Sequence, residues 1–324
     1  MKIAMLSRWH VHARGYANQV RENGHEVAVI WDDNVERGQG WARELGVPYE
    51  SDLGKVLAMT DVDGVIVNTE TSKHKDVIIA SAKAKKHVFT EKTLAATVAE
   101  CIDIEKAIEE NGVIFTIGYS QRSKPVVLYA KSLIEAGALG RITSARLRNA
   151  HGGSSDNWLP QHWYVKADAQ GGAMIDMGCH PLYIISYLLG EPARVASVFN
   201  EITGRGVDDN AVSVIEFKNQ AIAVIETALV SPVSPWALEL YGTEGTLIAL
   251  NNSTRISTKQ TQKMTDGFID VTKLPNALPT PLQTWFNAIE KGAPVVYGMK
   301  DAIALAELIE LAYISHEKGI VAKA

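Results

Sequence analysis

The first 120 residues alternate between short apolar runs and segments of helical character. The runs are rich in β-branched residues, as is typical of parallel strands that are buried on both faces. They cover residues 3–6, 26–31, 62–67, 87–89 and 113–117. The helical segments between them cover residues 13–23, 35–45, 76–85 and 97–110, and glycine follows three of these segments, as expected where helices end. Repeated strand–helix units with short links predict a parallel, doubly wound α/β sheet.

The second half of the chain has a different pattern, in which several apolar runs are joined by turns of hairpin length. The expected strands cover residues 142–150, 193–202, 211–217, 221–229, 237–241 and 246–250. Helices are expected over residues 126–136, 173–189, 281–291 and 301–318, with irregular connections over residues 251–279. We therefore predict a dinucleotide-binding domain over residues 1–121 and an α+β domain with a mostly antiparallel open sheet over residues 122–324.

The charge balance argues against several classes of partner. The chain has 324 residues, of which 32 are basic and 37 acidic, and no long run of either sign. This composition argues against nucleic acid or an anionic membrane as the main partner. Cys101 and Cys179 form neither a disulfide framework nor a C-x-x-C pair, which fits a reducing compartment. The first apolar run is too short for a signal peptide and no later run could span a bilayer, so we expect a cytoplasmic protein.

Polar residues follow the predicted parallel strands at the ends where an open α/β sheet binds its ligand. Asp32 and Asp33 come directly after the second strand, and Asn68 and Thr69 come after the third. A carboxylate after the second strand typically accepts hydrogen bonds from the adenosine ribose of NAD, and the second negative charge would repel the 2′-phosphate of NADP. The alternative is a solvated turn that caps the next helix. The sequence thus favours NAD over NADP.

The turn after the first strand has no glycine, which departs from the usual G-x-G-x-x-G of dinucleotide-binding folds. It reads Ser7, Arg8, Trp9, His10, Val11 and His12. The helix that follows can still offer its first amides to a pyrophosphate, and Arg8 or the two imidazoles could add contacts. An H-x-H pair also opens certain metal-dependent hydrolase barrels, but the hairpin-rich second half argues against such a barrel. We expect no metal.

Gly171 and Gly172 precede a segment in which Asp176 and His180 are four residues apart. If that segment is helical, both side chains project from one face, and the glycines leave room for a close ligand or backbone. With Lys92 after the fourth strand, an amine, a carboxylate and an imidazole make a proton-transfer set. The alternatives are a local hydrogen bond between Asp176 and His180 and a structural ion pair between Lys92 and Asp176.

Six motifs resemble those of the glucose–fructose oxidoreductase, inositol dehydrogenase and MocA family, in the family's order. They lie at residues 62–67 (V-D-G-V-I-V), 86–92 (K-H-V-F-T-E-K, for a strand ending in E-K-P), 117–122 (I-G-Y-S-Q-R, for V-G-Y-N-R-R), 137–142 (G-A-L-G-R-I), 171–180 (for G-G-x-x-x-D-x-G-x-H) and 240–246 (for Y-G-T-E-G-T). Besides the missing glycines, Thr93 replaces the proline, Glu70 and Thr71 replace P-N, and Tyr183 replaces an aspartate often found three residues past the histidine. These departures indicate a divergent branch.

The resemblance implies a Rossmann domain and an α/β domain whose open sheet often forms oligomer contacts, so we expect a homo-oligomer. It also implies an enzyme with a nicotinamide cofactor that acts on the CH–OH groups of a sugar, cyclitol or related polyol. By position, Lys92, Asp176 and His180 are the candidate catalytic residues. We expect His180 to act as acid and base, Lys92 to contact the reacting oxygen and Asp176 to orient, although Lys92 and His180 could exchange roles. The candidate cofactor contacts are Ser7, Arg8, Trp9, His10, His12, Asp32, Asp33, Asn68, Thr69, Glu91 and Lys92.

Residues 157–164 form a loop dense in aromatic and polar groups, and such groups suit a sugar ring with its hydroxyls. The candidate substrate contacts are Tyr119, Arg122, Trp158, His162, Trp163 and Tyr164, together with Asp176 and His180. The alternatives are a domain-interface cluster for the loop and a helix cap for Arg122. Three functions remain open: an NAD-dependent dehydrogenase or reductase, which leads; a non-redox enzyme whose bound NAD oxidises the substrate transiently for elimination or hydrolysis; and a non-catalytic nucleotide or ligand sensor.

Overall fold

The chain forms two compact units in the computed structural model, which describes residues 1–261 and 267–324. The first unit comprises Met1–Gly118 and Pro279–Ala306, and the second comprises Tyr119–Leu278 and Glu307–Ala324. This division differs from the predicted domains, 1–121 and 122–324, mainly because the chain returns to the first unit at residue 279. A pattern read along the sequence yields continuous domains and does not reveal such a return.

The first unit contains a six-stranded sheet in the order β3-β2-β1-β4-β5-β6, and all neighbouring strands are parallel. The strands are β1 (Lys2–Leu6), β2 (Glu26–Trp31), β3 (Tyr49–Glu50), β4 (Gly64–Val67), β5 (His87–Thr90) and β6 (Phe115–Ile117). This order is that of the doubly wound dinucleotide-binding sheet. The predicted parallel α/β architecture is confirmed, but β3 and the helix after it were not among the predicted elements.

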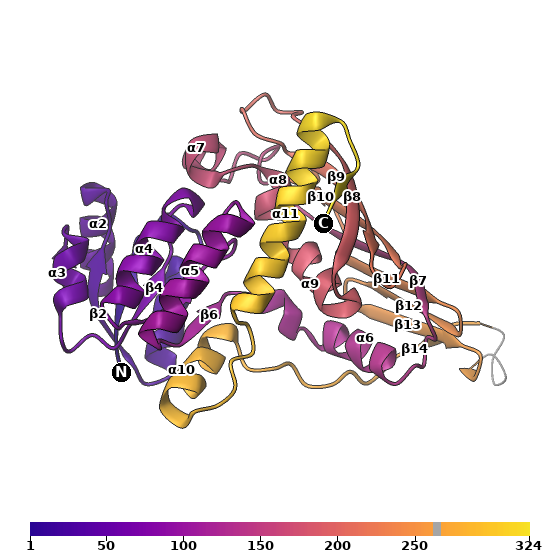
Figure 1. Cartoon of the computed structure of the whole chain (residues 1–324), viewed down its shortest axis with the longest axis horizontal. Helices are drawn as coiled ribbons and strands as arrows, with labels where there is room; N and C mark the ends of the chain where they lie inside the picture. The colour runs from indigo at the N-terminus through magenta and orange to yellow at the C-terminus, as the bar shows by residue number, and fades with distance from the viewer. Residues whose placement is uncertain (262–266) are drawn as a thin grey trace. The chain divides into compact units, whose positions relative to one another are not determined.

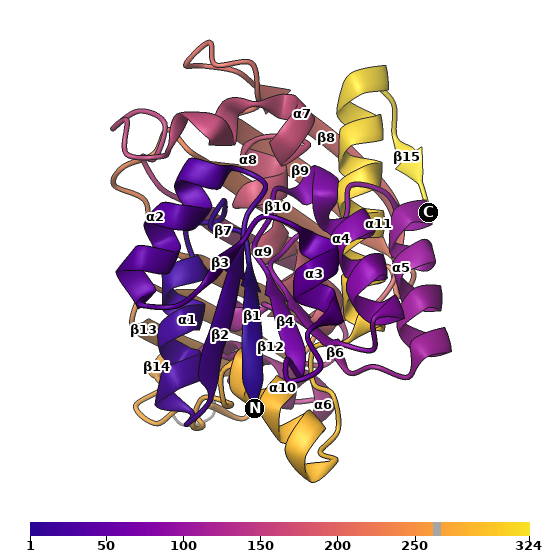
Figure 2. The ribbon, with the colours of Figure 1, turned by 90° about the vertical axis from the view of Figure 1, so that its left-hand side faces the viewer.

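Helices cover both faces of this sheet, as Figure 2 shows. They are α1 (Ala13–Glu22), α2 (Val35–Leu45), α3 (Leu53–Ala58), α4 (Thr71–Lys83), α5 (Val98–Asn111) and α10 (Pro281–Lys291). Local sequence explains their ends. The Asn34 side chain accepts the N–H of Arg37 at the start of α2, and Gly46, with φ of 70°, ends that helix in the left-handed conformation.

Helix α10 completes the hydrophobic core of the first unit, although it comes from a distant part of the sequence. Leu282, Trp285 and Phe286 pack in one cluster with residues of α1, α2 and β1. Trp285 is fully buried, and a β-carbon at Gly64 would lie 2.8 Å from its ring. A glycine in β4 therefore makes room for the indole ring of α10.

The second unit contains a nine-stranded sheet in the order β14-β13-β12-β11-β7-β10-β9-β8-β15. Only β7 and β10 pair in parallel among its described strands, which confirms the predicted mostly antiparallel sheet. The strands are β7 (Ile142–Ala150), β8 (Pro192–Asn200), β9 (Asn210–Phe217), β10 (Ile222–Ala228), β11 (Ala237–Gly242), β12 (Gly245–Leu250), β13 (Ser253–Thr258), β14 (Ile269–Asp270) and β15 (Ala322–Lys323).

One face of this sheet is covered by α6 (Pro125–Glu135), α8 (Ala173–Asp176) and α9 (Cys179–Leu189) (Figure 1). The other face is open. The strand register aligns Val198, Val212, Glu226 and Arg148 across it, and Val198 is 66% exposed. The remaining helical elements of the chain are η1 (Ser120–Ser123), η2 (Gln161–Tyr164), α7 (Lys166–Ala169) and α11 (Met299–Lys318).

Two predictions for the second unit are wrong. Residues 173–189 are not one helix, because α8 ends at Asp176 and α9 begins at Cys179. The N–H groups of Met177 and Gly178 both bond to the Ala173 carbonyl, which interrupts the regular helical pattern. Residues 251–279 are not all irregular, since they contain β13 and β14. The polar residues of β13 hide its strand pattern from the sequence, and residues 262–266 lie outside the described part of the chain.

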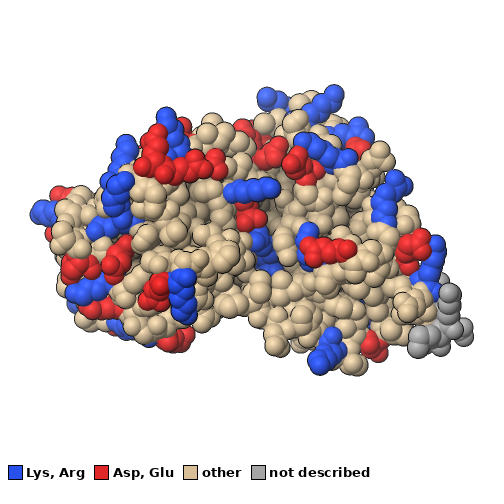
Figure 3. Space-filling model, turned by 60° about the horizontal axis from the view of Figure 1, so that its bottom comes forward, with Lys and Arg blue, Asp and Glu red and all other residues tan. Residues whose placement is uncertain are grey.

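Basic and acidic side chains alternate over the face drawn in Figure 3, with no large patch of one sign. Ion pairs such as Lys2 with Asp61, at 2.9 Å, reflect this mixing. No helix within the two described ranges has both the length and the apolar composition that a membrane crossing requires.

Trp285→Ala tests the return of α10 to the first unit. We expect it to lower the free energy of unfolding by about 3–5 kcal/mol, because it removes a fully buried aromatic ring from a packed cluster. Denaturant unfolding followed by circular dichroism measures the change. The control is Lys291→Ala on the exposed side of the same helix, which should change stability by less than about 0.5 kcal/mol. Similar small effects of both substitutions would contradict this assignment.

Candidate functional site

Four strand ends bring many of the predicted cofactor residues to one edge of the parallel sheet. The residues that follow β1, β2, β4 and β5 are Ser7, Asp32, Asn68, Thr69, Glu91 and Lys92, all of them buried. The strand order reverses between β1 and β4. Open α/β sheets bind their ligands at such a point.

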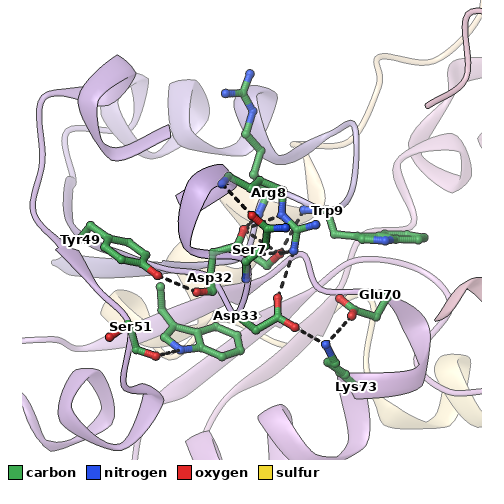
Figure 4. Close-up of polar contacts among 12 residues, drawn as sticks. Ser7, Arg8, Trp9, Asp32, Asp33, Tyr49, Ser51, Glu70 and Lys73 are labelled. Atoms are coloured by element: carbon green, nitrogen blue, oxygen red, sulfur yellow. Dashed lines mark hydrogen bonds and ion pairs between the residues drawn. The ribbon is translucent and has the colours of Figure 1, made fainter. Parts of the chain in front are cut away.

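The carboxylate of Asp32 is the centre of a polar network at the end of β2 (Figure 4). It accepts two hydrogen bonds from the Arg37 guanidinium, at 2.6 and 2.8 Å. It also accepts the Ser7 hydroxyl at 3.1 Å and the Arg8 N–H at 2.9 Å. Asp32 is fully buried, and a buried charge is tolerated only when it is paired. This carboxylate therefore holds the turn after β1 against the start of α2.

The turn after β1 keeps a dinucleotide-type geometry without the glycines. Ser7 has φ of 69°, in the left-handed region that favours glycine. Its hydroxyl accepts the N–H of Trp9 at 3.1 Å and donates to Asp32. The indole of Trp9 is buried, and the guanidinium of Arg8 pairs with Glu44 at 2.6 Å. Side-chain hydrogen bonds of Ser7 thus stabilise a backbone conformation that is unfavourable for serine.

Asp33, unlike Asp32, is partly accessible, with 32% of its side chain exposed. It pairs with Lys73 and, at 3.1 Å, with Arg37, while Lys73 also pairs with Glu70 at 2.6 Å. Partial burial alone would raise the pKa of Asp33, but the hydrogen bond from Lys73 and the charges of Lys73 and Arg37 hold it below its ordinary value. Asp33 is therefore an ionised carboxylate that a ligand can reach.

A second buried carboxylate, Glu91, gathers donors at the end of β5. His12 Nδ1 lies 2.9 Å from Glu91 Oε1, and His10 Nε2 lies 3.5 Å from Oε2. The Tyr16 hydroxyl donates to the same carboxylate. Burial alone would raise the pKa of Glu91, but the neighbouring histidines hold it well below its ordinary range. Both histidines of the H-x-H pair are thus directed at this carboxylate.

His10, His12 and Glu91 are also close enough to hold a metal, since their ligand atoms lie within 4.8 Å of one another. Two imidazoles and a carboxylate are ligands that zinc accepts. The backbone N–H of His12, however, donates to His10 Nδ1 at 3.2 Å. Because Nδ1 accepts this hydrogen bond, a neutral His10 ring carries its hydrogen on Nε2. A metal would need the lone pair of that same Nε2 atom. The geometry therefore suits a hydrogen-bonded cluster better than a metal centre.

Lys92 directly follows this carboxylate and is 6% exposed. Its backbone N–H, not its amine, donates to Glu91 Oε2 at 2.9 Å. Beside it, the buried imidazole of His74 connects two strand ends, with Nε2 3.1 Å from the Thr69 carbonyl and Nδ1 2.8 Å from the Thr93 carbonyl. The segments that carry Thr69 and Lys92 are thereby held together.

Helix α1 begins where sheets of this order bind a pyrophosphate. Its first turn contains no acidic residue, and the His12 side chain makes no capping hydrogen bond to it. The first amides of a helix are a favourable place for an anion. Together with the accessible carboxylate of Asp33, this helix start fits a dinucleotide.

In the second unit, the G-G motif lets a distant loop approach the start of α8. The carboxylate of Asp208 accepts the N–H of Gly172 at 2.9 Å and that of Met174 at 2.7 Å. Its backbone carbonyl accepts the Ala173 N–H at 2.6 Å, and Tyr313 donates to the carboxylate at 2.8 Å. A β-carbon at Gly172 would collide with the Asp208 carbonyl. Gly172 therefore allows a close approach of backbone, and Asp208 caps α8 from outside the helix.

Asp176 ends α8, and His180 lies in the first turn of α9. His180 is 7% exposed, and its Nδ1 lies 2.9 Å from the Tyr183 hydroxyl. That hydroxyl also accepts the N–H of Gln121 at 3.1 Å, and the ring of Tyr183 stacks on Tyr119 with centroids 4.2 Å apart. The tyrosine that replaces the family's aspartate is thus a direct partner of the candidate catalytic histidine.

The aromatic residues of the predicted substrate loop are not equally accessible. Trp158 is 55% exposed, whereas Trp163 is buried. The ring of His162 stacks with Trp163, with centroids 6.3 Å apart, and the guanidinium of Arg205 lies 4.5 Å from the centre of the Tyr164 ring. Trp158 is therefore the tryptophan of this loop that a ligand can reach.

Arg122, another predicted substrate contact, lies in η1 and is buried. Its guanidinium lies 4.7 Å from the centre of the Tyr187 ring. This cation–π contact fixes the side chain against α9.

The sequence did not predict Arg37, Lys73 and Tyr16 as partners of the carboxylates in the first unit, nor Asp208 as the carboxylate that binds the G-G motif. A basic residue on a surface helix is ordinary, so Arg37 and Lys73 carry little signal. One signal was present, because Arg37 follows Asp33 by four residues, the spacing of a helical ion pair. Nothing in the sequence around Asp208 marks it as the partner of the G-G motif.

Gly172→Ala tests the close approach at α8. We expect the variant to lose at least about 2 kcal/mol of stability, because the new β-carbon would collide with the Asp208 carbonyl and break its bonds to α8. Thermal and denaturant unfolding measure the loss. Gly40→Ala, on α2 with open space around it, is the matched control and should be neutral or slightly stabilising. A stable Gly172→Ala protein would refute the role of the glycine.

Two protein-family models match this chain. The model described as "Oxidoreductase family, NAD-binding Rossmann fold" matches residues 9–119, and the GFO/IDH/MocA C-terminal domain matches residues 127–248. A levoglucosan dehydrogenase structure in complex with NADH and levoglucosan has a TM-score of 0.86 at 24% identity, covering 100% of this chain and 99% of that one. This likeness concerns the fold.

Two curated relatives align over about seven-tenths of the chain. The scyllo-inositol 2-dehydrogenase (NAD(+)) of Bacillus subtilis (strain 168) is 31% identical over 73% of this chain and 69% of its own length. The 1,5-anhydro-D-fructose reductase of Ensifer adhaerens is 28% identical over 73% of this chain and 72% of its own length. The resemblance drawn from the six motifs is confirmed, as are the expectations of an oxidoreductase and of NAD. The chain belongs to the glucose–fructose oxidoreductase, inositol dehydrogenase and MocA family of NAD-binding oxidoreductases.

Proposed function

We propose that this protein transfers a hydride between NAD and a carbinol carbon of a sugar, cyclitol or related polyol. The observation that carries the proposal is the buried pair of Glu91 and Lys92 at the end of β5. This strand pairs with β4, which flanks the point where the order of the parallel sheet reverses. The names of two relatives, an inositol dehydrogenase and an anhydrofructose reductase, support this substrate class.

The cofactor contacts of this proposal come from the strand ends. Asp33 accepts hydrogen bonds from the adenosine ribose, because it is the accessible carboxylate at the end of β2. The first amides of α1 hold the pyrophosphate. Asp32 acts indirectly, by fixing the turn that carries Ser7. When bound, the nicotinamide supplies the hydride chemistry.

Lys92, Asp176 and His180 provide the proton transfer and orientation that accompany the hydride. An amine or an imidazole can take the hydroxyl proton during oxidation and return it during reduction. Asp176 orients the hydroxyl or the amine. The exposed ring of Trp158 is the aromatic surface offered to a sugar.

The homo-oligomer is also part of this proposal. The open face of the nine-stranded sheet exposes Val198, Val212, Val214 and Ile222. A second copy that covers these side chains would remove apolar surface from water.

Lys92→Met tests the proposed chemistry in an assay of NADH absorbance with a panel of polyols and their ketones. We expect turnover to fall about a hundredfold or more, because a proton-transfer group is lost. Binding of NADH, measured by fluorescence, should persist. Lys106→Met, at a lysine whose side chain is 73% exposed, is the control and should leave turnover unchanged. Near-normal turnover in Lys92→Met would rule out the assignment.

Asp33→Ala tests the cofactor contact. We expect the ratio of kcat/KM for NADP to that for NAD to rise about tenfold or more, because the repelling carboxylate is lost and its partners Arg37 and Lys73 become free to bind a 2′-phosphate. Asp32→Asn is the contrasting variant. It should destabilise the fold by about 3 kcal/mol, by leaving Arg37 without its buried partner, and should not change this ratio. An unchanged ratio in Asp33→Ala would show that Asp33 does not contact the ribose.

A further inference from the structure

The Nδ1 atom of His180 is in hydrogen-bond contact with the phenol of Tyr183. His180 and Tyr183 lie one turn apart on α9 and are 7% and 3% exposed. His180 Nδ1 lies 2.9 Å from the Tyr183 hydroxyl, and the two rings meet edge to face, with centroids 5.6 Å apart. Because both side chains are buried, this hydrogen bond is protected from competition by water.

The phenol oxygen has a second contact besides His180. The backbone N–H of Gln121 donates to the Tyr183 oxygen at 3.1 Å, and a backbone N–H can only donate. This contact fills one of the two acceptor sites of the phenol oxygen, and the geometry points to the hydroxyl hydrogen lying toward His180 Nδ1. A neutral imidazole whose Nδ1 accepts carries its hydrogen on Nε2.

The phenol is itself held in place. Its ring stacks on Tyr119 with an angle of 15° between the planes, and Tyr119 is fully buried. The stack on Tyr119 and the hydrogen bond from Gln121 thus restrict Tyr183 independently of His180, so Tyr183 restricts His180 in turn.

We propose that Tyr183 is a positioning residue that keeps His180 neutral with its hydrogen on Nε2. This inference rests on the proposed function. His180 then donates a hydrogen bond to the reacting oxygen and exchanges no proton, and Lys92 is the residue that exchanges it. This assignment reverses the roles expected for His180 and Lys92 from the sequence.

The chemistry of the two groups supports this division. Nε2 already bears a hydrogen, so it cannot accept one, and giving that hydrogen up would leave an imidazolate. In oxidation, the substrate O–H bond breaks and its proton forms an N–H bond at Lys92 Nζ, which enters as the free amine. The nicotinamide, when bound, would supply the acceptor for the hydride, and in reduction Lys92 would return the proton. A carboxylate in place of Tyr183 would instead hold a hydrogen on Nδ1 and leave Nε2 to accept the proton.

Nitrogen-15 NMR tests the tautomer directly. Protein labelled at its histidines is measured by long-range proton–nitrogen correlation at about pH 7.5, near which an imidazole is ordinarily neutral. His180→Asn identifies the His180 signal by its loss. We expect a neutral ring with hydrogen on Nε2. Tyr183→Asp should move the hydrogen to Nδ1 and raise the pKa of the imidazole, because a negative charge stabilises the cation. A wild-type ring with hydrogen on Nδ1, or a charged ring, would overturn the proposal.

Kinetics give a second readout. Asparagine retains an N–H donor but cannot exchange a proton, so His180→Asn should turn over at least about tenfold faster than His180→Ala. Tyr183→Phe should lower kcat about tenfold with little change in the KM of NAD, because only the orientation of His180 is lost. Equal activities of the Asn and Ala variants would refute the donor role.

The two experiments also separate this proposal from the proposed function. The NMR measurement needs neither polyol nor cofactor. A panel of polyols without NADH-linked turnover would refute the function, while the tautomer of His180 would still be decided by its spectrum.

Discussion

Carboxylates removed from water organise both units, because an ionised group without solvent must be surrounded by hydrogen-bond donors. In the first unit, Asp32 gathers donors from the turn after β1 and from α2, and Glu91 gathers them from the same turn and from α1. In the second unit, the partly buried Asp208 gathers the first amides of α8 and the hydroxyl of Tyr313. Each carboxylate connects segments that are distant in sequence. Removing one partner would leave the others around an incompletely satisfied charge, so each cluster forms as a whole.

Contacts of these carboxylates also explain why glycine is required at residue 172 but not at residue 7. At Gly172 another backbone lies where a side chain would be, and no substitution can satisfy that geometry. At Ser7 the backbone has the conformation that glycine prefers, but this buried position holds a small polar side chain. The serine hydroxyl then adds hydrogen bonds to Asp32 and Trp9 that glycine could not make. A fingerprint of glycines is therefore one solution for this turn, and hydrogen bonding to a buried carboxylate is another.

The elements that could be predicted from the sequence are those in which burial produces a pattern. Parallel strands covered on both faces appear as apolar runs, and the ends of those strands identified Asp33 and Lys92 as site candidates. The two-residue β3 is too short to show a pattern, and the polar residues of β13 obscure one. The place of α10 in the first core depends on contacts with residues far away in the chain. Apart from the four-residue spacing of Asp33 and Arg37, the partners of the carboxylates depend on side-chain directions that spacing in the sequence does not encode.

The requirement that gives the carboxylates their donors also explains why a phenol beside His180 matters. A buried carboxylate at that position would need hydrogen-bond donors, and the imidazole of His180 could supply one. The imidazole would then carry a hydrogen on Nδ1, and the negative charge would stabilise its cationic form. Tyr183 makes no such demand, since it is neutral and already receives the N–H of Gln121. Its hydroxyl can satisfy the imidazole without introducing a charge. A change of one side chain from acid to phenol would thus alter which nitrogen of the histidine carries the hydrogen.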